Sequence, residues 1–145
     1  MAHVSTYLNF AGNTEAAFLF YKLVFQTEFT GPIVRMGTAP MPPDAPPMAD
    51  ADKQLVMHVA LPITGGHILM GTDAVESMGH KLDQGNHVSI VLDVDSRTEA
   101  DALYAKLSAG GKTTMPMQDM FWGAYWGSCT DKFGMQWMVN VEGKK

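Results

Sequence analysis

The stretch NTEAAFLFYKLV, residues 13–24, and the stretch SRTEADALYAKL, residues 96–107, carry one pattern twice and decide the fold of this chain. Each begins with a residue suited to cap a helix and continues with apolar side chains at helical spacing. The two copies lie 83 residues apart, and their matching positions are Ala17, Phe20, Tyr21 and Val24 in the first and Ala100, Leu103, Tyr104 and Leu107 in the second. Two long copies indicate a duplicated module rather than a solenoid of short repeats.

Strand-like segments surround both predicted helices in the same order. The predicted strands are residues 4–10, 28–36, 55–61 and 67–72 in the first copy, and residues 87–92, 112–117, 121–130 and 135–141 in the second. Each copy therefore reads strand–helix–strand–strand–strand. We predict an α+β fold of two βαβββ modules in a single domain: module one is 1–75, a linker is 76–85, and module two is 86–145.

One proline-rich segment distinguishes the two modules. The turn glycines Gly66 and Gly134 lie 68 residues apart rather than 83, and the difference of 15 residues equals the length of segment 37–51. Six of the eight prolines lie between residues 32 and 47, a density that blocks helices and sheet ladders. We predict an extended loop, either a disordered excursion or a flap over the mouth of a pocket.

The composition excludes several classes of function. The net charge of −5 comes without any basic block, so we expect no nucleic-acid partner. The single cysteine, Cys129, cannot form an internal disulfide and fits a reducing compartment. The first residues lack a signal-peptide pattern, and no apolar stretch approaches the roughly 20 residues of a membrane span. We therefore expect a cytoplasmic protein with no membrane partner.

Methionines and aromatic residues are candidates for lining a ligand site. The chain has twelve methionines, which either fill the core or line an adaptable apolar pocket. The segment FWGAYWG, residues 121–127, places Trp122, Tyr125 and Trp126 on a predicted strand. These rings either pack across strands or form an aromatic wall for a flat or apolar ligand, and the sequence leaves both interpretations open.

Three polar residues stand beside predicted strands and turns. His58 has apolar neighbours and is either a hydrogen-bonded, partly buried histidine or an acid–base group in a pocket. Asp73 ends the last strand of module one, where it either caps the following turn or directs its carboxylate into a cleft. Asp131 opens the turn DKFG and is expected to accept hydrogen bonds from the backbone.

Three strings of the sequence also carry a family resemblance. YLNFAGNTEAAFLFYKLVF (7–25), HVALPITGGHILMGTDA (58–74) and FWGAYWGSCTDKFGMQWMVN (121–140) together resemble the PhnB-like branch of the vicinal-oxygen-chelate superfamily. That superfamily includes glyoxalase I, bleomycin-resistance proteins and extradiol dioxygenases. The resemblance implies that the two modules form an open, curved mixed sheet around a cleft and that the protein is a homodimer.

The resemblance also identifies where metal-using relatives hold their ligands, one on the first and one on the last strand of each module. The positions in module two are His87 and Met138, and those in module one are residues 4–6 and Met70. His3 would reach this position only after a one-residue slip, which turns the strand over. A thioether is a poor ligand for a divalent metal with oxygen substrates, so we expect no catalytic metal and no cofactor.

The sequence thus predicts a small-molecule-binding protein of unknown ligand, and leaves open whether the ligand is also turned over. The predicted ligand-binding residues are His58, Met70, His87, Trp122, Tyr125, Trp126 and Met138. The alternative is a lyase, isomerase or dioxygenase that depends on a divalent metal, with His87 as one ligand and His58 or Asp73 among its partners.

Overall fold

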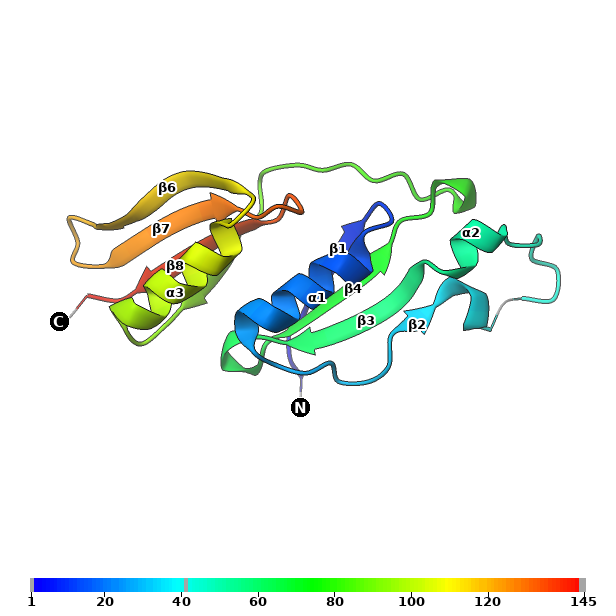
Figure 1. Ribbon diagram of the computed structural model, residues 1–145, viewed down its shortest axis with the longest axis horizontal. Coiled ribbons are helices and arrows are strands. Elements are labelled where there is room, and N and C mark those ends of the chain that lie inside the picture. Colours follow the sequence, from blue (N-terminus) through cyan, green and yellow to red (C-terminus); the bar gives the residue numbers. More distant parts are fainter. Residues whose placement is uncertain (1, 41, 144–145) are drawn as a thin grey trace. The chain divides into compact units, whose positions relative to one another are not determined.

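The computed structural model describes residues 2–40 and 42–143, except for the side chain of Met78. Its fold is α+β, with two four-stranded mixed sheets that stay open rather than closing into barrels (Figure 1). The chain divides into two compact units, with the boundary between Asp83 and Gln84. Both units have the strand–helix–strand–strand–strand order that the duplicated pattern predicts, so the predicted fold class is confirmed.

Unit one has the strand order β1-β4-β3-β2, in which β1 runs parallel to β4 and the other pairs are antiparallel. Helix α1 follows β1, and four short helical segments lie in the connections. The bounds are β1 Thr6–Phe10, α1 Thr14–Phe25, β2 Val34–Arg35, η1 Met36–Thr38, α2 Asp50–Lys53, β3 Val56–Pro62, η2 Thr64–Gly66, β4 Ile68–Asp73 and η3 Glu76–Met78.

Unit two repeats this arrangement with the strand order β5-β8-β7-β6, in which β5 runs parallel to β8. The bounds are β5 Ile90–Asp93, α3 Arg97–Ser108, β6 Lys112–Asp119, β7 Tyr125–Thr130 and β8 Gln136–Val141. No helix in the described part of the chain has the length and hydropathy that crossing a bilayer requires.

Each long helix packs its apolar stripe against one face of its own sheet. In α1 the aromatic residues Phe18 and Tyr21 are fully buried, whereas Phe20, which the sequence pattern places in the stripe, is half-buried. The ring of Phe18 lies so close to Gly71 that a Cβ added there would stand 2.5 Å from it. The helix-covered faces carry the buried sheet residues Leu8, Phe10, Val59, Leu61 and Leu69 in unit one and Leu92, Cys129, Trp137 and Val139 in unit two.

The opposite face of each sheet is the one that its long helix, α1 or α3, does not cover. Because side chains alternate along a strand, the pairing register identifies the residues on this face. We call it the open face: Tyr7, Asn9, His58, Ala60, Met70 and Thr72 in unit one, and Val91, Trp126, Ser128, Met138 and Asn140 in unit two.

Several predicted strands are shorter than expected, among them the one predicted at 121–130, which begins at Tyr125. Only Val34–Arg35 remains of the strand predicted at 28–36, because the Gly31-Pro32 pair interrupts it and proline has no N–H to donate. The strand predicted at 87–92 begins at Ile90, after a bend at residues 86–87. The helix caps also differ: Ser96 Oγ accepts a hydrogen bond from Glu99 N at 3.1 Å, whereas Asn13 makes no side-chain capping bond.

Candidate functional site

The two open faces place methionines at equivalent positions. Tyr7 of β1 lies opposite Met70 of β4. In unit two, Val91 of β5 lies opposite Met138 of β8. Met70 and Met138 are half-buried, while Tyr7 and Val91 are each 51% exposed. The 68-residue offset read from the turn glycines therefore pairs the two methionines correctly.

A ring stands beside each of these methionines. His58 of β3 and Trp126 of β7 also lie 68 residues apart, and both are half-buried. His58 is the diagonal neighbour of Met70, and Trp126 is the diagonal neighbour of Met138. Diagonal neighbours on adjacent strands lie within reach of a long side chain. The His58 ring also lies 6.2 Å from the Tyr7 ring between centroids. Four of the predicted ligand-binding residues, His58, Met70, Trp126 and Met138, thus share the two open faces.

A pocket of about 310 Å³ opens in unit one where β1 and β4 end. Its walls combine apolar and hydrogen-bonding side chains: Tyr7, Asn9, Met36, Met57, Thr72 and His80. Asp73, whose carboxylate was predicted either to cap a turn or to point into a cleft, also lines this pocket, whereas no site role is predicted from the sequence for the other six. Period-two alternation could have identified Tyr7 and Asn9, because Leu8 and Phe10 are buried on the other face. The remaining residues follow no periodicity that would identify them.

Tyr125 lies apart from this group, on the helix-covered face of its sheet. Its hydroxyl donates to Asp101 Oδ1 of α3 at 2.6 Å, and the Arg97 guanidinium lies 4.4 Å from its ring centroid. The hydrogen bond to the Asp101 carboxylate raises the pKa of Tyr125. This ring therefore joins α3 to β7, while the neighbouring Trp126 faces the other side of the sheet.

Trp122 and His87 lie outside the strands predicted to carry them. Trp122 is in the turn between β6 and β7, where its ring packs edge-on against Phe121 with centroids 4.8 Å apart. Trp122 is 59% exposed and Phe121 is 96% exposed. His87 is also exposed and stands three residues before β5. Strand alternation therefore assigns neither residue to an open face.

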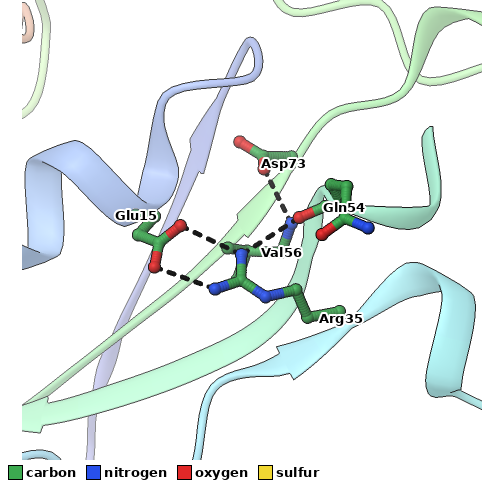
Figure 2. Close-up of polar contacts among 5 residues, drawn as sticks. All are labelled: Glu15, Arg35, Gln54, Val56 and Asp73. Atoms are coloured by element: carbon green, nitrogen blue, oxygen red, sulfur yellow. Dashed lines mark hydrogen bonds and ion pairs between the residues drawn. The ribbon is translucent and has the colours of Figure 1, made fainter. Parts of the chain in front are cut away.

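Asp73 is a buried carboxylate whose hydrogen-bond partners the sequence does not predict. Its Oδ1 accepts hydrogen bonds from Thr14 N at 3.1 Å and from Thr14 Oγ1 at 2.6 Å. Its Oδ2 accepts from Val56 N at 2.8 Å (Figure 2). The side chain is 4% exposed. Asp73 therefore joins the starts of α1 and β3 to the end of β4, and it supplies the cap that Asn13 does not.

Arg35 forms a second polar link beside Asp73, as Figure 2 shows. Its guanidinium donates to both oxygens of Glu15, at 3.0 and 2.8 Å, and to the carbonyl oxygen of Gln54 at 3.0 Å. The hydrogen bond from Arg35 lowers the pKa of Glu15. The pair thereby fixes β2 against α1 and against the chain that enters β3.

Asp131 has the role in the DKFG turn that the sequence predicts. Its Oδ1 accepts from the backbone N–H groups of Phe133 and Met135 at 2.8 and 3.0 Å. Its Oδ2 accepts from Trp137 Nε1 at 2.8 Å, a bond that no sequence pattern predicts. Burial raises the pKa of the neighbouring Cys129 thiol to about 11, so this cysteine is a poor nucleophile at neutral pH.

The residues at the family's metal positions do not fit a divalent metal within either unit. Among the described residues, no three His, Cys, Asp or Glu side chains lie together as a ligand group. The strand register corrects the residue expected to match His87. Thr6 and Ile90 are the first residues of β1 and β5 and occupy equivalent positions. Because His3 precedes Thr6 by as many residues as His87 precedes Ile90, His3 is the counterpart of His87. Both histidines are exposed and precede their strands. The other two positions hold the thioethers of Met70 and Met138.

Comparison with known proteins places the chain in one family. The family model described as 3-demethylubiquinone-9 3-methyltransferase matches residues 2–140. The protein YjdN of Escherichia coli (strain K12) is 32% identical over 145 residues, which cover 95% of this chain and 94% of that protein.

Solved structures agree with this placement. Protein PA1353 from Pseudomonas aeruginosa is 33% identical with a TM-score of 0.84, over 99% of this chain and 100% of that one. The PhnB protein from Bacillus cereus, a putative 3-demethylubiquinone-9 3-methyltransferase, is 23% identical with a TM-score of 0.74, over 97% and 100% of the two chains. Two members of the glyoxalase/bleomycin resistance/dioxygenase family, at 18% and 15% identity and TM-scores of 0.61 and 0.64, share the fold.

Proposed function

We propose that the chain binds a small molecule on the open faces without a catalytic metal. The premise is its family: it belongs to the 3-demethylubiquinone-9 3-methyltransferase family, which is the PhnB-like branch of the vicinal-oxygen-chelate superfamily. The activity in the family's description is not part of this proposal. In the sequence, no glycine-rich loop of the kind that binds a nucleotide cofactor follows a strand.

One observation carries the proposal: the same pair, a ring and a thioether, occupies equivalent positions on both open faces. His58 stands beside Met70, and Trp126 stands beside Met138. Contiguous apolar surface is unfavourable in water and marks a place where a ligand or another surface binds. Thioethers adapt their shape to a ligand and make favourable contacts with aromatic rings. We therefore expect a ligand with a flat or apolar body.

Several polar groups lie together in the pocket at the ends of β1 and β4. Asn9, Thr72 and His80 line the pocket of about 310 Å³. This volume suits a small organic molecule, and a few polar groups in an apolar wall fix its orientation. A single sheet face covers a ligand from one side only. The proposal therefore includes a cytoplasmic homodimer, whose additional sheets provide further wall.

A binding experiment with 2-naphthol as probe tests the proposal. We expect that the double variant Met70→Ala/Met138→Ala weakens binding about tenfold or more, because each substitution removes several buried methylene equivalents from the contact. The matched control is Leu23→Ala on the outer face of α1, where Leu23 is 76% exposed. Equal affinity of the double variant and the control would contradict the proposal.

Metal content distinguishes the proposal from its alternative, a divalent-metal-dependent lyase, isomerase or dioxygenase. Protein purified without chelator is analysed by elemental mass spectrometry, with His87→Ala as the comparison. We expect no stoichiometric divalent metal in either sample. A stoichiometric metal that disappears in His87→Ala would establish the alternative. Sedimentation analysis of the same sample tests the proposed homodimer. A monomer at micromolar concentration would contradict the homodimer.

A further inference from the structure

The proline-rich insert, residues 37–51, builds a pocket of its own in unit one. The pocket has a volume of about 580 Å³, and its walls include Pro42, Pro46, Pro47, Met48, Asp52 and Ser77. Among the described residues it shares no lining residue with the pocket of about 310 Å³ at the ends of β1 and β4. Its volume lies within the range of small-molecule sites.

Two hydrogen bonds hold the base of the insert closed. Met36 N donates to the carbonyl oxygen of Leu55 at 2.9 Å. The Arg35 guanidinium donates to the carbonyl oxygen of Gln54 at 3.0 Å (Figure 2). Gly37 allows the two sides to approach, because an added Cβ would stand 2.6 Å from the Cβ of Lys53. The two ends of the insert are therefore fixed at the sheet, and the pocket walls begin from a defined position.

The prolines reduce the conformational freedom of the walls. Proline fixes φ near −65°, so a wall containing three prolines has fewer conformations to lose when a ligand binds. A turn orders one end of this wall further, since Ala45 N donates to the carbonyl oxygen of Pro42 at 3.0 Å. Proline rings and the Met48 thioether present an apolar surface with no donor to satisfy. The pocket therefore suits the apolar part of a ligand.

One carboxylate marks the polar side of this pocket. Asp52 Oδ2 accepts from Ser77 Oγ at 3.0 Å, which fixes the orientation of the carboxylate. A carboxylate offers about four acceptor positions, so Asp52 retains capacity for a donor from a ligand. The nearest lysine in sequence, Lys53, is paired with Asp50 at 3.1 Å. Three aspartates and one lysine lie between residues 36 and 53, which makes the segment favour a cation.

From this juxtaposition of a proline wall and an oriented carboxylate, we infer that the insert pocket binds a small organic amine, with the apolar body against the prolines and the ammonium group on Asp52. This site is separate from the open faces, and its ligand class differs from the one proposed for them. A charge-assisted hydrogen bond to Asp52 supplies the selectivity for a cation over a neutral molecule of the same shape.

The experiment compares 1-naphthylmethylamine with its uncharged analogue 1-naphthalenemethanol by calorimetric titration of the full chain. We expect the amine to bind about tenfold more tightly than the alcohol. Asp52→Asn should remove that difference while the alcohol affinity stays the same. The matched control is Asp50→Asn, which changes a 98% exposed carboxylate in the same helix that is not part of the pocket wall.

A second variant keeps the test independent of the open faces. Ala45→Phe fills the insert pocket from its wall and should remove the preference for the amine over the alcohol. An unchanged far-ultraviolet circular dichroism spectrum shows that the variant is folded. Equal affinities for amine and alcohol, equal effects of Asp50→Asn and Asp52→Asn, or amine binding weaker than about 1 mM would each overturn the inference. None of these results bears on the open-face proposal.

Discussion

Replacement of Asp73 by alanine should destabilise unit one strongly. The substitution removes a buried carboxylate that accepts three hydrogen bonds, two from Thr14 and one from Val56 N. Two backbone N–H groups then lose their acceptor at the first residues of α1 and β3. Both groups lie beside fully buried side chains, so water cannot readily replace the carboxylate.

The magnitude follows from these bonds. A hydrogen bond to a charged group contributes about 1.5–3 kcal/mol, and an unpaired buried donor costs about 1–3 kcal/mol. Because the lost bonds share one acceptor and the site relaxes in part, we expect Asp73→Ala to lower the free energy of unfolding by about 3–5 kcal/mol. Asp73→Asn keeps one oxygen for Thr14 but presents an amide N–H to Val56 N. We expect Asp73→Asn to lower the free energy of unfolding by about 1.5–3 kcal/mol.

The assay is urea unfolding followed by far-ultraviolet circular dichroism. All three tryptophans lie in unit two, at residues 122, 126 and 137, so tryptophan fluorescence reports unfolding of that unit separately. The control is Asp93→Asn, an exposed carboxylate that accepts from Asn140 Nδ2 at 2.9 Å, and we expect a change below about 0.5 kcal/mol. A loss below about 1 kcal/mol for Asp73→Ala would refute the reasoning.

Three further predictions concern packing, capping and thiol chemistry. Gly71→Ala places a Cβ 2.5 Å from the fully buried Phe18 ring and should lower the free energy of unfolding in urea by about 1–3 kcal/mol. The control Gly31→Ala, with nothing within 4 Å of the added Cβ, should lower it less. The reverse order would contradict the packing of Phe18 on Gly71. Ser96→Ala should cost about 1 kcal/mol and Asn13→Ala much less, because only Ser96 makes a side-chain capping bond; equal losses would contradict this. Burial raises the pKa of Cys129 to about 11 from 9.0, so folding keeps the thiol neutral and stability should decline as the pH rises above 9.0. A disulfide reagent at pH 8 should label it only after urea is added, and rapid labelling of the folded protein would contradict the burial.

The sequence predicts the long elements of the fold because their signals are local. Apolar spacing identifies both helices, and the Ser96–Glu99 pattern identifies the cap that the structure shows. Strand boundaries are less accessible, because a bend at residues 86–87 and the Gly31-Pro32 pair act against otherwise strand-like residues.

The candidate site is only partly predictable for a related reason. Met70 and Met138 follow from the repeat offset, whereas the position of His58 beside Met70 and of Trp126 beside Met138 depends on the strand register. The role of Asp73 depends on partners 59 and 17 residues away, which no local pattern relates to it. Side-chain type alone also suggested that Tyr125 and Trp126 act together, whereas adjacent strand residues point to opposite faces.

The length of the insert affects the entropy of forming the sheet of unit one from the unfolded chain. The parallel pair of unit one joins Thr6 to Leu69, 63 positions along the chain, and that of unit two joins Ile90 to Trp137, 47 positions along. Closure entropy grows only with the logarithm of this separation, so the longer path of unit one costs about 0.3 kcal/mol more. That difference is smaller than the contribution of a single capping side chain. An added segment of this size therefore hardly affects the thermodynamics of the sheet, and one module of a duplicated fold is free to acquire it while the other stays short.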